Sequence, residues 1–128
     1  MNTYPKKNGF SPWGEIQTVT GIAPGIYSVT TASHGGLWVS DERMAMMPDA
    51  LKCNVYGEGQ WFEEDCEWAL VVLAFPTEFT NDKWLIAAQT IGSYIGGGVY
   101  QRAAQWLAQK EPHLWERRSG QNAVVICL

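Results

Sequence analysis

Hydrophobic and polar positions alternate in two segments near the N-terminus of the chain. Residues 15–21 and 26–33 are rich in Val, Ile, Thr and Tyr, and Ala23-Pro24-Gly25 lies between them. Alternating β-branched and aromatic residues on both sides of a Pro-Gly turn are typical of a β-hairpin. We therefore expect an antiparallel hairpin in this part of the chain.

Apolar positions at helical spacing follow in three further segments. Ser40 precedes two acids, which predicts a capped helix up to Met47, and Pro48 opens a second short helical turn. Thr80 is expected to cap a helix over residues 81–95, which the glycines at 96–98 end. A further helix is predicted over residues 99–110, and the apolar run 123–127 suits a strand that joins the hairpin.

The stretch over residues 60–75 packs four acids between aromatic residues and then continues as an apolar run. Phe62, Cys66 and Leu73 share one helical face, and acids in a first turn favour a helix. Residues 69–75 are apolar all round, so they should be buried on every side. A central strand over 69–75 is the alternative, because short apolar runs fit both structures. We interpret residues 62–75 as a helix that Pro76 ends.

These elements predict an α+β fold in one domain over residues 1–128. A small antiparallel sheet, made of the N-terminal hairpin and the C-terminal strand, is expected to be packed by three or four helices. A chain of 128 residues has the usual length of one domain, and it shows no internal repeat or low-complexity segment.

Composition indicates a globular, reduced protein of the cytoplasm. Hydrophobic residues make up 46% of the chain and charged residues 17%. The three cysteines, Cys53, Cys66 and Cys127, are widely spaced and odd in number, which argues against a disulfide framework. The N-terminus lacks the apolar segment of a signal peptide, and the apolar run 68–75 is too short to span a bilayer, so no membrane partner is expected.

Acidic residues are concentrated in the middle of the chain. The net charge of −4 argues against direct binding of nucleic acid. Seven acids and no Lys or Arg lie between Cys53 and Asp82. These acids either form the solvated side of a helix start or present charge to a basic partner surface. The second interpretation assigns partner binding to Glu58, Trp61, Glu63, Glu64 and Glu67, with an exposed Trp61 or Trp38 as the aromatic anchor.

His34 is the main candidate for catalysis. It precedes two glycines, which let the backbone turn sharply or approach another group closely. With a carboxylate among Glu63, Glu64 and Asp65, and with Cys66, it could form a nucleophile, base and orienter set. The structural alternative is a glycine turn across which His34 hydrogen-bonds to a carboxylate and locks the hairpin to the helix.

The sequence predicts neither a metal site nor a cofactor. Its two histidines, His34 and His113, have no close ligand spacing. Three adjacent acids on a helix would point about 100° apart from one another, so they could not face one ion. The glycines at 96–98 lack the Gly-Lys-Ser/Thr ending of a phosphate-binding loop.

Several motifs occur together along the first two thirds of the chain. They are Thr-Ala-Ser-His-Gly-Gly at 31–36, Ser-Asp-Glu-Arg at 40–43, Pro48, Trp-Phe-Glu-Glu-Asp-Cys-Glu-Trp at 61–68, and Phe-Pro at 75–76. In these motifs the chain resembles a family of uncharacterised proteins carried by phages, plasmids and other mobile elements, over residues 13–80. The family has no established activity, so the resemblance implies a setting and not a reaction. Small acidic proteins from that setting often look like inhibitors of host defence, including anti-CRISPR proteins that act by binding.

We therefore expect a small phage or mobile-element protein that binds another protein with a basic surface in the cytoplasm of the host bacterium. An inhibitor of a host defence system such as CRISPR-Cas fits this description, and no catalytic residue is assigned to it. One alternative is a small enzyme that uses His34 with a carboxylate among Glu63, Glu64 and Asp65. Another is a structural protein that acts by self-association.

Overall fold

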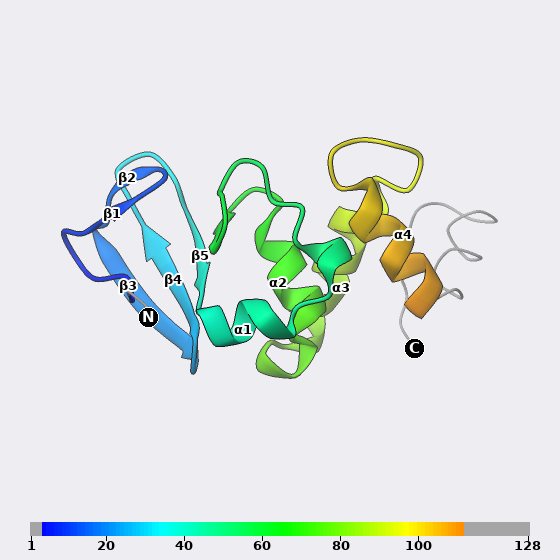
Figure 1. The fold of residues 1–128 in the computed structure, drawn as a ribbon, viewed down its shortest axis with the longest axis horizontal. Coiled ribbons are helices and arrows are strands. Elements are labelled where there is room, and N and C mark those ends of the chain that lie inside the picture. Colours follow the sequence, from blue (N-terminus) through cyan, green and yellow to red (C-terminus); the bar gives the residue numbers. More distant parts are fainter. Residues whose placement is uncertain (1–3, 112–128) are drawn as a thin grey trace.

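A computed structural model, which describes residues 4–111, places a β-sheet at one end of the molecule and helices at the other (Figure 1). The sheet is antiparallel with the strand order β3-β4-β5-β6. Its strands are β3 (Thr18–Ala23), β4 (Ile26–Thr30), β5 (Gly35–Val39) and β6 (Trp61–Glu63). Two short strands, β1 (Phe10–Ser11) and β2 (Gly14–Glu15), form a separate ribbon beside it.

The helices pack beside the sheet, and together they confirm the predicted α+β class. Its elements are α1 (Asp41–Met46), η1 (Asp49–Leu51), α2 (Trp68–Ala74), η2 (Pro76–Glu78), α3 (Asn81–Gly92) and α4 (Gln101–Lys110). The strand predicted over residues 123–127 lies outside the described residues. Across residues 4–111, no helix combines the length and the hydrophobicity that crossing a membrane requires.

Locally encoded elements form where the sequence predicts them. The N-terminal hairpin is present as β3 and β4, joined at Pro24-Gly25. The Ser40 hydroxyl accepts a hydrogen bond from the Arg43 N–H at 3.2 Å and caps α1. The Thr80 hydroxyl caps α3 in the same way. Each cap satisfies a backbone N–H that has no partner within its own helix.

Gly35 and Gly36 do not form the predicted turn, because both lie in the buried strand β5. The turn precedes them, and the Thr31 N–H donates to the His34 carbonyl at 2.7 Å. Instead, the glycines let other parts of the chain lie close to the β5 backbone. A Cβ on Gly36 would collide with the Phe62 carbonyl and would lie 2.6 Å from the Trp13 ring. Glycine at this position lets β6 and Trp13 lie directly against β5.

The helix predicted over residues 62–75 is wrong in its first part. Residues 61–63 form β6, and the helix begins only at Trp68. Phe62 pairs with Leu37 across the sheet, and its side chain is fully buried. A residue that occupies the sheet edge and the core at once gains more burial than it would on a solvated helix start.

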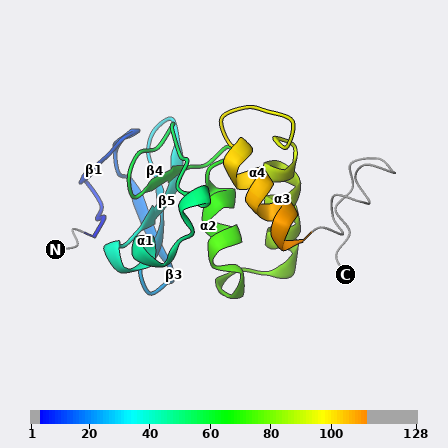
Figure 2. The same cartoon turned by 45° about the vertical axis from the view of Figure 1, so that its right-hand side comes forward.

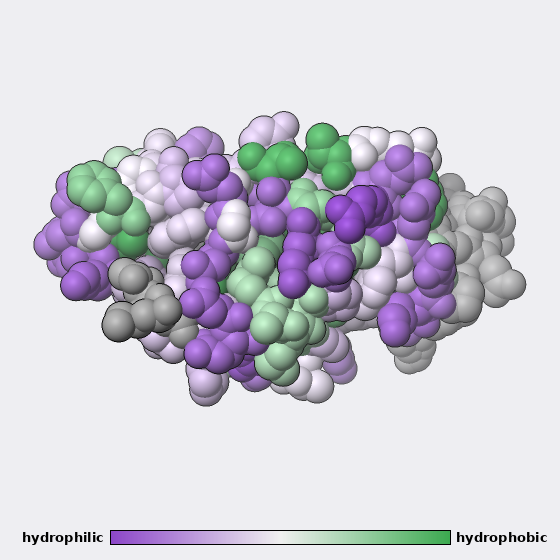
Figure 3. Space-filling model, in the orientation of Figure 1, coloured by the Kyte–Doolittle hydropathy of each residue, from purple (hydrophilic) through white to green (hydrophobic). Residues whose placement is uncertain are grey.

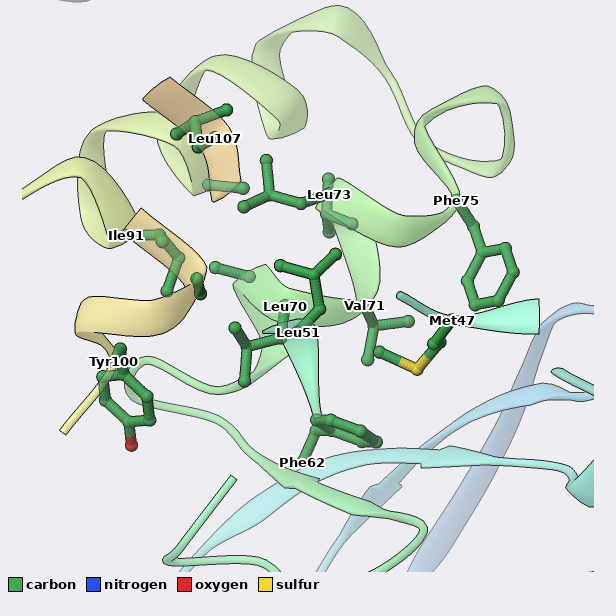
Figure 4. Close-up of a cluster of buried hydrophobic side chains, with 14 of the residues drawn as sticks. Met47, Leu51, Phe62, Leu70, Val71, Leu73, Phe75, Ile91, Tyr100 and Leu107 are labelled. Carbon is green, nitrogen blue, oxygen red and sulfur yellow. The ribbon is translucent and has the colours of Figure 1, made fainter. Parts of the chain in front are cut away.

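Helix α2 lies between the sheet and helices α3 and α4 (Figure 2). It contacts β5, β6, η1 and α3, and all residues from Ala69 to Leu73 are buried, which confirms the predicted all-round burial. Figure 4 shows Leu70 and Val71 among side chains from the sheet and the other helices, including Phe62 and Leu51. The core is therefore built around the apolar run that the sequence made prominent.

Candidate functional site

A pocket of about 560 Å³ opens where the sheet meets the helices. Its walls come from the β1–β2 turn, the β4–β5 turn, the segment 52–60, the connection from β6 to α2, and the loop before α4. Figure 1 shows several of these segments along the upper edge of the molecule. The lining residues are Trp13, His34, Tyr56, Glu63, Asp65, Cys66, Tyr94, Val99 and Tyr100.

Two carboxyl groups from one turn contribute to the wall of this pocket. Glu63 is only 6% exposed, and its Oε1 accepts hydrogen bonds from the backbone N–H of Asp65 at 2.9 Å and of Cys66 at 3.4 Å. Burial raises the pKa of Glu63, and its hydrogen bond to the Asp65 carboxyl raises the pKa further, although the Asp65 N–H opposes both effects. Two neighbouring carboxyl groups in a partly desolvated wall disfavour each other's charge.

Glu67 lies behind this wall, and its side chain is fully buried. Its carboxylate accepts five hydrogen bonds. The donors are the backbone N–H groups of Val55 (2.5 Å), Tyr56 (2.9 Å), Gly57 (2.7 Å) and Glu63 (3.2 Å), and the Tyr100 hydroxyl (2.8 Å). Burial raises the pKa of Glu67, but hydrogen bonds from Tyr56, Gly57, Tyr100 and Val55 outweigh it and hold the pKa below its usual value. The buried carboxylate is therefore ionised and structural.

The burial of Glu63 and Glu67 corrects the expectation of a solvated row of acids. Glu67 cannot present charge to a partner, because it is enclosed by its own donors. The helix on which that expectation rested does not begin until Trp68, so the acids lie on a strand and a turn. Of the five acids between residues 58 and 67, Glu58, Glu64 and Asp65 are exposed.

His34 lies at the rim of the same pocket as Glu63, Asp65 and Cys66. Its Nδ1 lies 3.8 Å from Oε2 of Glu64, with the two side chains 51% and 49% exposed. This distance is longer than a hydrogen bond. The structure thus brings His34 into the wall that the acids form, and pairs it loosely with Glu64 across the β5–β6 edge.

The two tryptophans considered as anchors lie elsewhere. Trp38 is 2% exposed and is covered by the Tyr4 ring, with the ring centroids 5.0 Å apart, so it is not an exposed anchor. Trp61 is partly buried and stacks edge-on against Trp13 at 5.7 Å. Trp13, which the sequence analysis did not single out, is therefore the tryptophan that lines the pocket.

Two tyrosines complete the wall on the helical side. Tyr94 and Tyr100 pack edge to face at 4.9 Å, and the Tyr94 hydroxyl lies 3.6 Å from the Cys66 sulfur. The hydrogen bond with Cys66 raises the pKa of Tyr94, and burial raises that of Tyr100. Both hydroxyls are therefore protonated and engaged, and ring surface is what these residues offer to the pocket.

Exposed apolar side chains lie along part of the pocket rim. Tyr56 and Val99, which line it, are 66% and 53% exposed, and Val55, next to Tyr56 in the chain, is 57% exposed. Figure 3 shows hydrophobic residues at the upper edge of the molecule, over the segments that carry these side chains in Figure 1. Sequence patterns could not group them, because they come from two loops without periodicity.

Within the described part of the chain, no three His, Cys, Asp or Glu side chains gather closely enough to hold a metal ion. Cys53 and Cys66 are free thiols.

Comparison with known proteins gives a family but no activity. Neither a curated protein nor a solved structure matches the chain. One family model, described as a domain of unknown function (DUF7007), matches residues 6–124. The match includes the sheet, the acidic turn and every residue that lines the pocket. The chain therefore belongs to the DUF7007 family.

Proposed function

We propose that this protein acts by binding another protein, and that the pocket with its apolar rim is the contact surface. The observation that carries the proposal is a pocket with acidic and aromatic walls, two of whose lining residues, Tyr56 and Val99, are exposed apolar side chains. Aromatic pockets surrounded by apolar side chains are where binding energy concentrates in protein interfaces. Single apolar residues on a surface need no such explanation, but a group around a pocket does.

The partner that fits this proposal is a component of a host defence complex with a basic surface, such as CRISPR-Cas, in the cytoplasm of a bacterial host. The support is the small size of the chain, its net charge of −4 and the resemblance of its motifs to proteins of phages and other mobile elements. Acidic surfaces speed and orient association with basic ones.

Affinity purification from a bacterial host, followed by mass spectrometry, tests the proposal. Val99→Asp places a charge in the apolar rim, and Ile86→Asp is the matched control, because Ile86 is 50% exposed on α3 outside the pocket lining. Wild type and Ile86→Asp are expected to retain one stoichiometric partner that Val99→Asp loses. The absence of a stoichiometric partner, or equal retention by all three proteins, would refute binding through this surface.

A small enzyme is the second candidate, and the placement of His34, Glu63, Asp65 and Cys66 around one pocket favours it. In this case His34 would act as a general base on a ligand in the pocket. Screening the protein against chromogenic esters, amides and phosphate esters tests it. Turnover that His34→Ala abolishes at unchanged stability would support the enzyme. Turnover that survives His34→Ala, or none across the panel, would count against His34 catalysis.

A further inference from the structure

We infer that the pocket accepts one basic side chain, an arginine or a lysine, from the partner protein. The inference rests on the proposed function for its occupant, but its chemistry comes from the pocket itself. Two properties of the lining residues carry it: carboxyl groups without a lysine or arginine beside them, and aromatic walls.

The charge in the pocket has one sign. Glu63 and Asp65 both contribute to the wall, and none of the lining residues is a lysine or an arginine. His34, the only lining residue that can become cationic, already faces the Glu64 carboxylate. An anionic ligand would therefore meet repulsion, whereas a cationic group would offset the repulsion between the two carboxyl groups.

The remaining walls are aromatic and suit the same ligand. Trp13, Tyr56, Tyr94 and Tyr100 line the pocket, and an ammonium or guanidinium group is attracted to the face of such rings. The Tyr94 and Tyr100 hydroxyls already hydrogen-bond to Cys66 and Glu67, so these residues offer the ligand their ring faces. Carboxylates next to aromatic rings favour an organic cation with an apolar stem over a hydrated metal ion.

Trp13 gives a probe of binding in the pocket wall. Its indole Nε1 is the one buried side-chain nitrogen or oxygen in residues 4–111 that has no hydrogen-bond partner. A lysine or arginine head group has no acceptor, so this N–H is a probe of changes in the pocket wall and not a contact for the ligand's charge. The ring itself is held against Gly36 and Trp61, which fixes its position.

Nuclear magnetic resonance titration of the full chain tests the inference. The probes are N-acetyl-arginine methylamide, N-acetyl-lysine methylamide and N-acetyl-citrulline methylamide, the last being a neutral isostere of arginine. We expect saturable shifts at the Trp13 indole N–H with at least one of the two basic probes, weaker in high salt, and no saturation with citrulline.

Asp65→Asn removes a charge from an exposed position in the pocket, and Asp82→Asn, the same change at an exposed acid of α3 outside the lining, is the control. Asp65→Asn should weaken binding of the basic probe by up to about fivefold, the effect of losing one exposed ion pair, while Asp82→Asn leaves it unchanged. Equal binding of citrulline, shifts away from the pocket, or no shifts at all would overturn the inference.

The two proposals fail separately. If Val99→Asp loses the captured partner but no basic probe binds, the protein binds its partner through the rim, and the inference of a bound basic side chain is wrong. If a basic probe binds in the pocket but no partner is captured, the pocket has the inferred chemistry and the proposed function is wrong.

Discussion

Replacing Glu67 by glutamine tests the central structural claim, that a buried carboxylate holds the pocket walls together. Glu67→Gln keeps the size of the side chain but turns one acceptor oxygen into a donor. Oε2 of Glu67 accepts from Val55, Tyr56 and Tyr100, whereas Oε1 accepts from Gly57 and Glu63. An amide oriented to serve the first group would turn its N–H₂ toward the two remaining N–H donors.

The expected cost follows from these two orphaned donors. A buried donor left without a partner costs about 1–3 kcal/mol, so Glu67→Gln should lower the free energy of unfolding by about 2–6 kcal/mol. A domain of this kind has a total stability of about 5–15 kcal/mol, so the variant should be folded but markedly weaker. Glu64→Gln is the control. Its half-exposed carboxylate makes only a loose ion pair with His34, and its loss should cost less than about 0.5 kcal/mol.

Urea unfolding at several pH values measures both effects. Because the folded-state pKa of Glu67 is lowered, its stabilisation is present above the ordinary value of 4.5 and is lost as pH falls through the folded pKa. The gap between wild type and Glu67→Gln should therefore be largest near neutral pH and shrink in acid. A gap no larger than that of Glu64→Gln, or one that grows in acid, would refute the role of the buried carboxylate.

Two further substitutions check the surroundings of the pocket. Tyr100→Phe removes one of the five donors to the ionised Glu67 and should lower the free energy of unfolding in urea by about 1.5–3 kcal/mol. No change would mean that this hydrogen bond adds no net stability. Gly36→Ala places a methyl group against Trp13 and the Phe62 carbonyl and should lower the melting temperature by an amount equivalent to about 1–3 kcal/mol. Gly96→Ala, which meets open space, should be neutral or slightly stabilising by about 0.4–1 kcal/mol, and equal losses in the two glycine variants would contradict the close-approach argument.

The features that the sequence predicted correctly are those encoded within a few residues. The β3–β4 hairpin follows from alternation around Pro24-Gly25, and the helix starts at Ser40 and Thr80 follow from caps that act three residues away. The burial of residues 69–73 follows from the length of an uninterrupted apolar run. In each case the decisive interaction lies inside the window that a pattern covers.

The features that could not be predicted from the sequence depend on residues that are distant along the chain. Strand β6 exists because β5 offers an edge, and nothing in residues 61–63 alone distinguishes that pairing from a helix start. The pocket is built from five separate segments, so Tyr94 and Val99 gave no local signal. The structure places His34, Glu63 and Asp65 in the lining of one pocket, but only the fold decides which acid His34 faces.

The acidic turn shows why residue type alone did not reveal the role of each carboxylate. Glu67 and Asp65 are two positions apart, yet one is enclosed by donors from residues 55–57 and Tyr100 and the other is exposed in the pocket. The two carboxylates differ because hydrogen-bond donors from distant parts of the chain surround Glu67 and not Asp65.

The buried and exposed acids then depend on each other. The carboxylate of Glu67, which no partner can reach, fixes the backbone at Tyr56 and the hydroxyl of Tyr100, and so shapes the wall beside Asp65. Substitutions in this one turn should therefore divide into two classes. Those at Glu67 change stability first and binding only through it, whereas those at Asp65 change binding at constant stability. Under the proposed binding function, the exposed Asp65 is held in place by a turn whose neighbouring charge, Glu67, is withdrawn from solvent and fully hydrogen-bonded.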